Sequence, residues 1–183
     1  YGLTETGLNT VLRPEDHKSR GQCTGREVYN CEVRISDEGR EVGVGQVGEI
    51  LISGANHGMI GYLNRPKETS ETKQGQWIRT GDLARREEHG FFTIVGRSTD
   101  MIISGAENIY PKEIEDVLRT HPAVVDVAVF GIPDDVYGES VCAAIVCAEG
   151  TQPRSEEIIS FCTDHLAGYK KPKKIIFSSD LSR

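Results

Sequence analysis

The sequence lacks features that would point to a membrane protein or a structural zinc protein. No apolar run approaches the roughly 20 residues that a membrane-spanning helix needs. Its five cysteines include no Cys-x-x-Cys pair, so the usual spacing of zinc ligands is absent. Positive charge is also in deficit, because 21 basic residues face 28 acidic ones and the formal net charge is -7. Nucleic acid and anionic membranes repel such a chain, so we expect neither as a partner.

The cysteines fit a reducing compartment. Cys142 and Cys147 lie within the apolar run 141–148, and the other three are scattered along the chain. An odd number of thiols, two of them in an apolar run, is typical of buried free cysteines, and we therefore predict a cytoplasmic protein. With 183 residues, the chain is long enough for one large or two small globular domains. The oligomeric state is left open.

The first half of the chain has the pattern of a β-rich domain. Apolar and polar residues alternate, and dense glycines with apolar residues between them indicate tight turns rather than a linker. The His89-Gly90 pair between two strand patterns predicts a hairpin. Strands are predicted at 32–35, 47–53, 82–87 and 91–95, and a short helix at about 66–73.

After residue 97 the pattern changes to that of a small α+β domain. Pro111 occupies a position favoured for the first residue of a helix, and Ser155 is a candidate N-cap for a second helix. Strands are predicted at 101–103, 124–132, 141–148 and 174–177. We therefore predict an α+β fold in which a β-rich part, 1–97, precedes a β-α-β-β-α-β domain, 98–183.

Four short stretches carry groups that nucleotide chemistry needs. The first, Tyr1-Gly2-Leu3-Thr4-Glu5-Thr6-Gly7, combines hydroxyls, a carboxylate and glycine backbone. Backbone amides suit phosphate oxygens, and a carboxylate suits a hard cation such as Mg2+. The same residue types also fit a capped loop at the start of a helix, which is the commoner arrangement for this stretch taken alone.

Each of the other three stretches also has both a ligand-binding interpretation and a purely structural one. In Arg79-Thr80-Gly81-Asp82 the carboxylate can accept hydrogen bonds from both hydroxyls of a ribose, or it can form an Asx-turn. Arg97, in Gly96-Arg97-Ser98-Thr99-Asp100-Met101-Ile102, also fits an exposed salt bridge. Tyr169-Lys170-Lys171-Pro172-Lys173-Lys174 favours a phosphate-bearing partner or forms a solvated face.

In this order and spacing, the four stretches resemble the later signature motifs of the adenylate-forming superfamily. That superfamily contains acyl-CoA synthetases, peptide-synthetase adenylation domains and firefly-type luciferases. The resemblance covers essentially the whole chain and includes Gly61-Tyr62-Leu63-Asn64-Arg65-Pro66 and Gly75-Gln76-Trp77. The stretch Ile102-Ile103-Ser104-Gly105-Ala106-Glu107-Asn108-Ile109-Tyr110-Pro111, followed by Glu113-Ile114-Glu115, is similar to acyl- and aryl-CoA ligases in particular.

Enzymes of this family activate a carboxylic acid with ATP as an acyl-adenylate, and the CoA ligases then transfer the acyl group to coenzyme A. The resemblance therefore implies ATP or AMP, Mg2+, coenzyme A and a small-molecule carboxylic acid as ligands, and a place in fatty acid metabolism. It assigns catalytic roles to Thr4, at the AMP phosphate, and to Glu5, as the Mg2+ ligand.

The remaining nucleotide positions follow by similarity. Tyr1 and Gly2 match residues beside adenine and the acyl group, with Thr4 next to them. Asp82 and Arg97 match the positions that hold the ribose hydroxyls.

The resemblance also implies that the small domain is mobile and binds coenzyme A. Thr99 matches the hinge, where many relatives have Asp or Lys, and Asp100 is the adjacent candidate. Many relatives have Gly where Ala106 stands, in the segment that lines the pantetheine tunnel. The positions that match coenzyme A contacts are Gly105, Ala106, Glu107, Tyr137, Lys171 and Lys173.

Two other functions share these motifs. An adenylation domain that loads a carrier protein would use the same nucleotide site, and Tyr137, Lys171 and Lys173 favour coenzyme A over it. A non-catalytic nucleotide-binding or regulatory relative is the second alternative, and the presence of Glu5, Asp82 and Arg97 argues against it.

By the same resemblance, a Gly/Ser/Thr-rich phosphate loop lies upstream of Tyr1 and a catalytic lysine follows residues 181–183. We therefore expect the sequence to be a C-terminal fragment of such an enzyme, with its small domain truncated before that lysine.

We predict that the purified 183-residue polypeptide does not form acyl-adenylate, because those two elements are needed to position the triphosphate and to stabilise the transferring charge. ATP–pyrophosphate exchange with a panel of carboxylic acids should stay at the level of a protein-free control. Exchange above that level with any acid would contradict the prediction.

Overall fold

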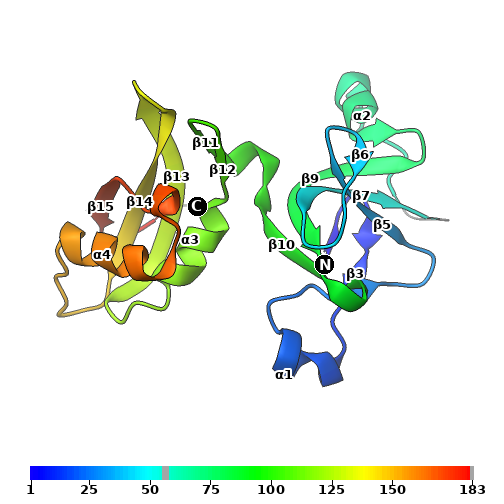
Figure 1. The fold of residues 1–183 in the computed structure, drawn as a ribbon. Helices are drawn as coiled ribbons and strands as arrows, with labels where there is room; N and C mark the ends of the chain where they lie inside the picture. Colours follow the sequence, from blue (N-terminus) through cyan, green and yellow to red (C-terminus); the bar gives the residue numbers. More distant parts are fainter. Residues whose placement is uncertain (55–57, 182–183) are drawn as a thin grey trace. The chain divides into compact units, whose positions relative to one another are not determined.

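A computed structural model describes residues 1–54 and 58–181, which divide into two compact units. The first unit is Tyr1–Ser98 and the second is Thr99–Arg183 (Figure 1). The sequence analysis placed the division between 97 and 98. Residues 182–183, after which the catalytic lysine was expected, lie outside the described residues.

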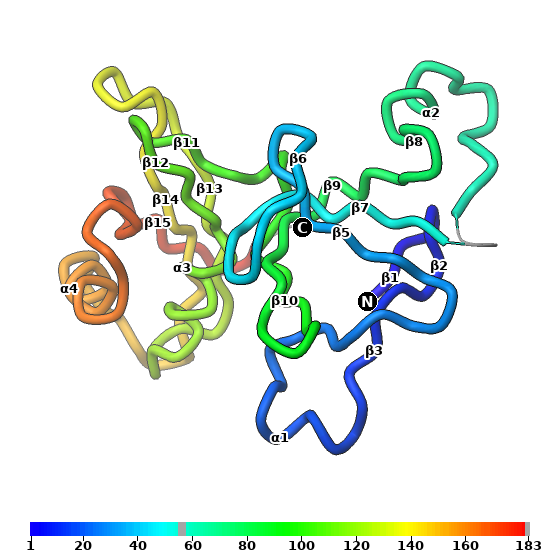
Figure 2. The backbone as a smooth tube through the Cα atoms, turned by 45° about the vertical axis from the view of Figure 1, so that its right-hand side comes forward, coloured from blue at the N-terminus to red at the C-terminus, as the bar shows by residue number. Residues whose placement is uncertain are grey.

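The first unit is built on an antiparallel sheet. Its strand order is β10-β9-β7-β5-β6. Strand β8 pairs with the first two residues of β9, Trp77 and Ile78. The neighbouring strands can be followed side by side in Figure 2. Their bounds are β5 (Glu32–Asp37), β6 (Arg40–Glu41), β7 (Val47–Ser53), β8 (Lys73–Gln74), β9 (Trp77–Arg86) and β10 (Phe92–Arg97).

Two small strand pairs and short helices complete the first unit. Strands β1 and β2 form one antiparallel pair, and β3 and β4 form another. The strand bounds are β1 (Gly2–Leu3), β2 (Gly7–Leu8), β3 (Thr10–Val11) and β4 (Arg26–Glu27). The helical segments are η1 (Pro14–Asp16), α1 (His17–Arg20), α2 (Pro66–Thr72) and η2 (Glu88–Gly90).

Alternating side chains explain how this sheet forms its core. In β5, Val33 and Ile35 are buried while their neighbours face outward, as the alternation in the sequence predicts. Ile50 and Ile52 of β7 pack against them. Apolar residues of period two therefore create one buried face, and the polar residues between them remain available for a site.

The second unit is a mixed sheet with two helices on one face (Figure 1). Its antiparallel order is β12-β11-β14-β13, and β15 runs parallel to β14. The strands are β11 (Ile102–Ser104), β12 (Glu107–Ile109), β13 (Val124–Asp134), β14 (Gly138–Cys147) and β15 (Lys174–Ser178). The helical segments are α3 (Pro111–Leu118), α4 (Ser155–His165) and η4 (Gly168–Lys170), and η3 (Ser98–Asp100) includes the last residue of the first unit and the first two of the second.

The α+β fold class predicted from the sequence is confirmed. The structure adds one strand to the second unit, and it adds the short strands β1–β4, β6 and β8 to the first. Strand β12 forms a hairpin with β11, where the sequence analysis expected a single strand. The turn passes through Gly105, whose φ of 65° is left-handed and favours glycine. Three residues in β12 are too few to produce a recognisable alternation, so the sequence pattern did not reveal this strand.

The two helices bury the faces that their spacing predicts. Ile114 and Leu118 of α3 and Ile158 and Cys162 of α4 belong to the core of the second unit. The parallel β14–β15 pair requires a crossover, and α4 supplies it. The N-cap predicted for α4 was wrong by one residue.

Arg154, not Ser155, is the N-cap of α4. Its backbone is extended, and its amide donates to Glu157 Oε2 at 3.1 Å. Ser155 is instead the first helical residue. The carboxylate three residues after the cap satisfies an otherwise unpaired amide, so a serine cap is not needed.

All five cysteines are free thiols, and Cys142 and Cys162 are buried while the others are partly buried. Burial raises the pKa of the Cys162 thiol to about 11. Across the described ranges, no helix has both the length and the apolar character to cross a membrane.

Replacing Ile114 by alanine should destabilise the second unit by about 2–5 kcal/mol, because this side chain is 0% exposed and its loss leaves a cavity. The matched control is Ile103→Ala, since Ile103 is 52% exposed and its loss should cost less than about 0.5 kcal/mol. Native-state hydrogen exchange of β14 amides measures the effect within this unit. Equal protection in the two variants would contradict the assignment of the core.

Candidate functional site

The first motif forms a hairpin. Strand β1 pairs with β2, and Thr4 and Glu5 lie in the turn between them. Gly2 allows the two strands to approach closely, because a Cβ there would collide with the carbonyl of Gly7. Within residues 1–8 no helix begins, so the capped loop at a helix start does not form. The turn presents Thr4 at the surface and leaves Glu5 half-buried.

Asp82 lies at the centre of a polar network in the first unit. Its Oδ2 accepts a hydrogen bond of 2.7 Å from the hydroxyl of Tyr1. Its Oδ1 lies 3.2 Å from Nε of Arg97, and this ion pair follows from the sheet, where the two residues are cross-strand partners. Asp82 is 9% exposed, whereas Arg97 reaches solvent. Each carboxylate oxygen keeps further acceptor capacity, which suits the two hydroxyls of a ribose.

The phenol of Tyr1 is kept in its neutral, donating form. Burial, and secondarily the hydrogen bond to Asp82, raises the pKa of the Tyr1 hydroxyl. Its backbone carbonyl accepts hydrogen bonds from the amides of Asn9 at 2.9 Å and Thr10 at 3.1 Å. Both ends of the residue are therefore fixed, so the ring is held against the Asp82 carboxylate.

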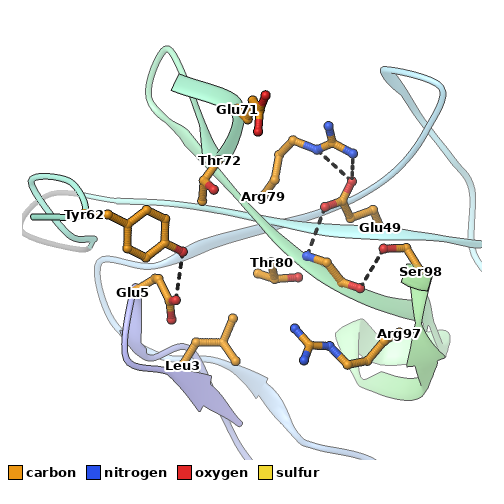
Figure 3. Close-up of a pocket in the computed structure, with 11 residues that line it drawn as sticks. Leu3, Glu5, Glu49, Tyr62, Glu71, Thr72, Arg79, Thr80, Arg97 and Ser98 are labelled. Carbon is orange, nitrogen blue, oxygen red and sulfur yellow. Dashed lines mark hydrogen bonds and ion pairs between the residues drawn. The ribbon is translucent and has the colours of Figure 1, made fainter. Parts of the chain in front are cut away.

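Glu5 is held by two residues of the segment 58–62. The hydroxyl of Tyr62 donates to Glu5 Oε1 at 2.9 Å, and Figure 3 shows the two side chains pointing toward one another. The amide of Met59 donates to the Glu5 carbonyl at 2.7 Å. Burial, followed by the hydrogen bond to Glu5, raises the pKa of the Tyr62 hydroxyl. One carboxylate oxygen is thus held by Tyr62, and the other, Oε2, can face a ligand.

Glu5 and Arg97 line the same pocket, which has a volume of about 320 Å³ (Figure 3). A second pocket of about 480 Å³ is lined by Thr4 and again by Glu5. The structure therefore gathers the predicted nucleotide residues of the first unit around one region. These residues are Tyr1, Gly2, Thr4, Glu5, Asp82 and Arg97.

The predicted hinge residues lie where the second unit begins in the sequence. Thr99 and Asp100 belong to the short 3-10 segment η3, and both are exposed. The Thr99 hydroxyl donates to Asp100 Oδ1 at 2.9 Å. A local bond of this kind is compatible with a backbone rotation, because it joins neighbouring side chains only.

The predicted pantetheine segment forms the turn of the β11–β12 hairpin. The Gly105 amide donates to the Tyr137 carbonyl at 2.8 Å, which ties this turn to the loop between β13 and β14. Ala106 and Glu107 are exposed beside it. The structure thus joins the predicted residue Gly105 to Tyr137, with Ala106 and Glu107 following it in the same hairpin.

Tyr137 and Lys173 are also in contact. The Lys173 ammonium lies 4.0 Å from the centre of the Tyr137 ring and 3.1 Å from Asp134 Oδ2. The Tyr137 amide, and then the Lys173 ammonium, lower the pKa of the Asp134 carboxyl. In the part of the chain that the structure describes, Lys171 forms no hydrogen bond or ion pair with this group.

Sequence reasoning missed several residues of the first site. Tyr62 contacts the predicted residue Glu5, and Glu49 contacts Gly81 of the motif that contains Asp82. Tyr62 was part of the family resemblance without a role of its own. Glu49 lies in the apolar strand 47–53, where a single glutamate gives no sign that it reaches another strand.

Two family descriptions match the chain. Residues 1–63 match "AMP-binding enzyme" and residues 113–183 match "AMP-binding enzyme C-terminal domain". Among curated proteins, a 2-succinylbenzoate–CoA ligase of Bacillus cereus strain Q1 is 42% identical over 184 residues. That match covers 100% of this chain but 38% of the relative, so the chain spans less than half of the relative's length.

Solved structures give matches to related enzymes. An o-succinylbenzoate CoA synthetase of Bacillus subtilis, in complex with its acyl-adenylate intermediate, is 35% identical with a TM-score of 0.93. The match covers 100% of this chain and 37% of that protein. The amide bond synthetase McbA of Marinactinospora thermotolerans is 36% identical with a TM-score of 0.92, covering 100% and 38%.

The two family matches lie in different units, residues 1–63 in the first and residues 113–183 in the second. Together with full-length coverage of this chain by the relatives, they agree with the motifs in the sequence. The chain belongs to the AMP-binding, adenylate-forming enzyme family.

Proposed function

We propose that this chain contributes part of an ATP-dependent acid–CoA ligase, which converts a carboxylic acid to an acyl-adenylate and then to a thioester. The observation that carries the proposal is the network of Tyr1, Asp82 and Arg97 beside the pocket of Glu5. A buried carboxylate between a neutral donor and a guanidinium is suited to two ribose hydroxyls.

In this proposal each first-unit residue has a separate task. Asp82 accepts hydrogen bonds from the ribose hydroxyls while Arg97 orients it, and Tyr1 and Gly2 lie beside adenine and the acyl group. The exposed hydroxyl of Thr4 donates to the AMP phosphate. These contacts orient the nucleotide, so that the attacked phosphorus and the acid's carboxylate meet in line.

Glu5 fits the usual way in which proteins hold Mg2+ with ATP. Among the described residues, no group of three or more His, Cys, Asp or Glu side chains could hold a metal by themselves. Mg2+ commonly takes one or two carboxylates and completes its shell with substrate phosphates and water. Glu5 offers one such carboxylate, and bound Mg2+ would spread the negative charge of the departing pyrophosphate.

We propose that the second unit binds coenzyme A. Tyr137 offers an aromatic face and Lys173 an ammonium to the nucleotide part of coenzyme A, with Lys171 as a further cation. The turn at Gly105, Ala106 and Glu107 then lies along the pantetheine arm. Rotation at Thr99 and Asp100 separates this step from adenylation.

The relatives support an acid–CoA ligase and favour an aromatic carboxylic acid as its substrate. The curated matches act on 2-succinylbenzoate, an aromatic carboxylate, so they give no support to a role in fatty acid metabolism. Relatives of known structure have been solved with AMP, and with ATP and Mg2+. Because McbA is an amide bond synthetase, the fold also serves enzymes with a different acyl acceptor. The contacts of Tyr137 and Lys173 favour coenzyme A as the acceptor here.

We predict that Asp82→Asn weakens AMP binding to this chain about 10- to 100-fold, because it removes a charged acceptor worth about 1.5–3 kcal/mol. Isothermal titration calorimetry measures the change. Asp37→Asn is the matched control, since Asp37 is an exposed aspartate of the same sheet. Equal AMP affinity in the two variants would rule out the proposed ribose site.

We predict that Lys173→Ala weakens coenzyme A binding to this chain about three- to tenfold, with a further loss when Lys171 is also replaced. The effect should shrink as salt is raised, because a lysine–phosphate attraction is screened. Lys112→Ala is the control, as Lys112 also pairs with an aspartate, Asp116. Identical coenzyme A titrations of Lys173→Ala and Lys112→Ala would contradict the proposal.

A further inference from the structure

The strand that carries Asp82 is irregular just before this residue. Glu49 on β7 pairs with Leu83 on β9, and the next pair is Leu51 with Arg79. Between these pairs β9 has residues 80–82 where β7 has one residue only. Such a bulge takes backbone groups out of the regular ladder and changes the direction in which a side chain points.

Side-chain hydrogen bonds hold the backbone of the bulge. The Gly81 amide donates to Glu49 Oε1 at 3.0 Å, and the Gly81 carbonyl accepts from the Ser98 hydroxyl at 3.1 Å. The Asp82 amide donates to Thr80 Oγ1 at 3.1 Å. Gly81 has a φ of 73°, a left-handed conformation that favours glycine. Figure 3 shows the side chains of Glu49 and Ser98, which bond the amide and the carbonyl of Gly81 respectively.

Arg79 fixes the orientation of Glu49. The second carboxylate oxygen, Oε2, accepts from Arg79 Nε at 2.9 Å and from Nη2 at 2.6 Å. The Glu49 side chain is 14% exposed, so its contacts are shielded more than those of a surface ion pair. Each oxygen of Glu49 therefore has its own partner, and the carboxylate joins the Arg79 guanidinium to the Gly81 amide.

We propose that Glu49 is a positioning residue for ribose recognition. By accepting the Gly81 amide hydrogen, it holds the bulge in the conformation that directs the Asp82 carboxylate toward the ribose hydroxyls. In this proposal Glu49, whose side chain also lines the pocket, acts through the Gly81 amide. This inference rests on the proposed AMP site, and it adds a residue to that site which no motif of the sequence assigned.

The competing explanation is that Glu49 only stabilises the sheet. The two explanations differ in their effect on ligands, because a positioning role matters only when the ribose hydroxyls are present. A nucleotide without them, 2′,3′-dideoxy-AMP, removes the contact that Asp82 makes. The ratio of AMP affinity to 2′,3′-dideoxy-AMP affinity therefore reports on Asp82 orientation and is insensitive to a general loss of stability.

The experiment is calorimetry of the full chain with both nucleotides, using Glu49→Ala. We expect AMP affinity to fall about tenfold while affinity for 2′,3′-dideoxy-AMP stays within about twofold of the unsubstituted chain. Glu41→Ala is the matched control, because Glu41 is a glutamate of the same sheet that pairs with Arg34. It should leave both affinities unchanged.

Ser98→Ala tests the same bulge from the carbonyl side and serves where Glu49→Ala does not fold. Ser98 is exposed, so its replacement should preserve the fold and lower the AMP preference about threefold. Fluorescence of Trp77, the single tryptophan, monitors folding of the first unit.

The outcomes separate this inference from the proposed function. An AMP preference that is lost in Asp82→Asn and kept in both Glu49→Ala and Ser98→Ala overturns the positioning role and leaves the AMP site standing. Equal weakening of both nucleotides in Glu49→Ala also overturns it, in favour of a purely structural role. An unsubstituted chain that does not prefer AMP overturns the ribose site and the inference together.

Discussion

The site in the first unit depends on how one carboxylate is held. Asp82 is nearly buried, and a buried charge is tolerated only where hydrogen bonds and an opposite charge compensate for lost hydration. Tyr1 supplies a neutral donor on one oxygen and Arg97 a cation on the other. Burial raises the pKa of the Tyr1 phenol, because an ionised phenol would lose hydration there, and the hydrogen bond to Asp82 raises it further. The carboxylate is therefore held in one orientation and keeps acceptor capacity, which the proposed contact with ribose hydroxyls needs.

The backbone around Asp82 departs from the regular pairing of β7 and β9. A continuous ladder between β7 and β9 would leave no bulge to redirect Asp82. The interruption is compensated by side chains, since Glu49 and Ser98 bond the amide and the carbonyl of Gly81. The same sheet thus combines an irregular backbone at the candidate site with regular strand pairing in its core.

The second unit follows a different principle, because its candidate contacts are on the surface. Lys173 lies against the Tyr137 ring and near Asp134, all of them in loops or at strand ends. Surface cations of this kind keep their hydration and bind phosphates mainly through charge, so their contribution depends on salt. The core of this unit, by contrast, is formed where the helices α3 and α4 pack on the sheet.

The sequence by itself determined most of the elements and the chemical character of the motifs. The alternation of Val33 and Ile35 and the helical spacing of Ile114 and Leu118 are local patterns, which a reader of the sequence can detect. Only the tertiary structure decided which side chains meet. Tyr1 and Asp82 are 81 residues apart, Glu5 and Tyr62 are 57 apart, and Gly81 and Glu49 are 32 apart. Local periodicity says which residues of a strand face inward, but it specifies neither the neighbouring strand nor the position of a bulge.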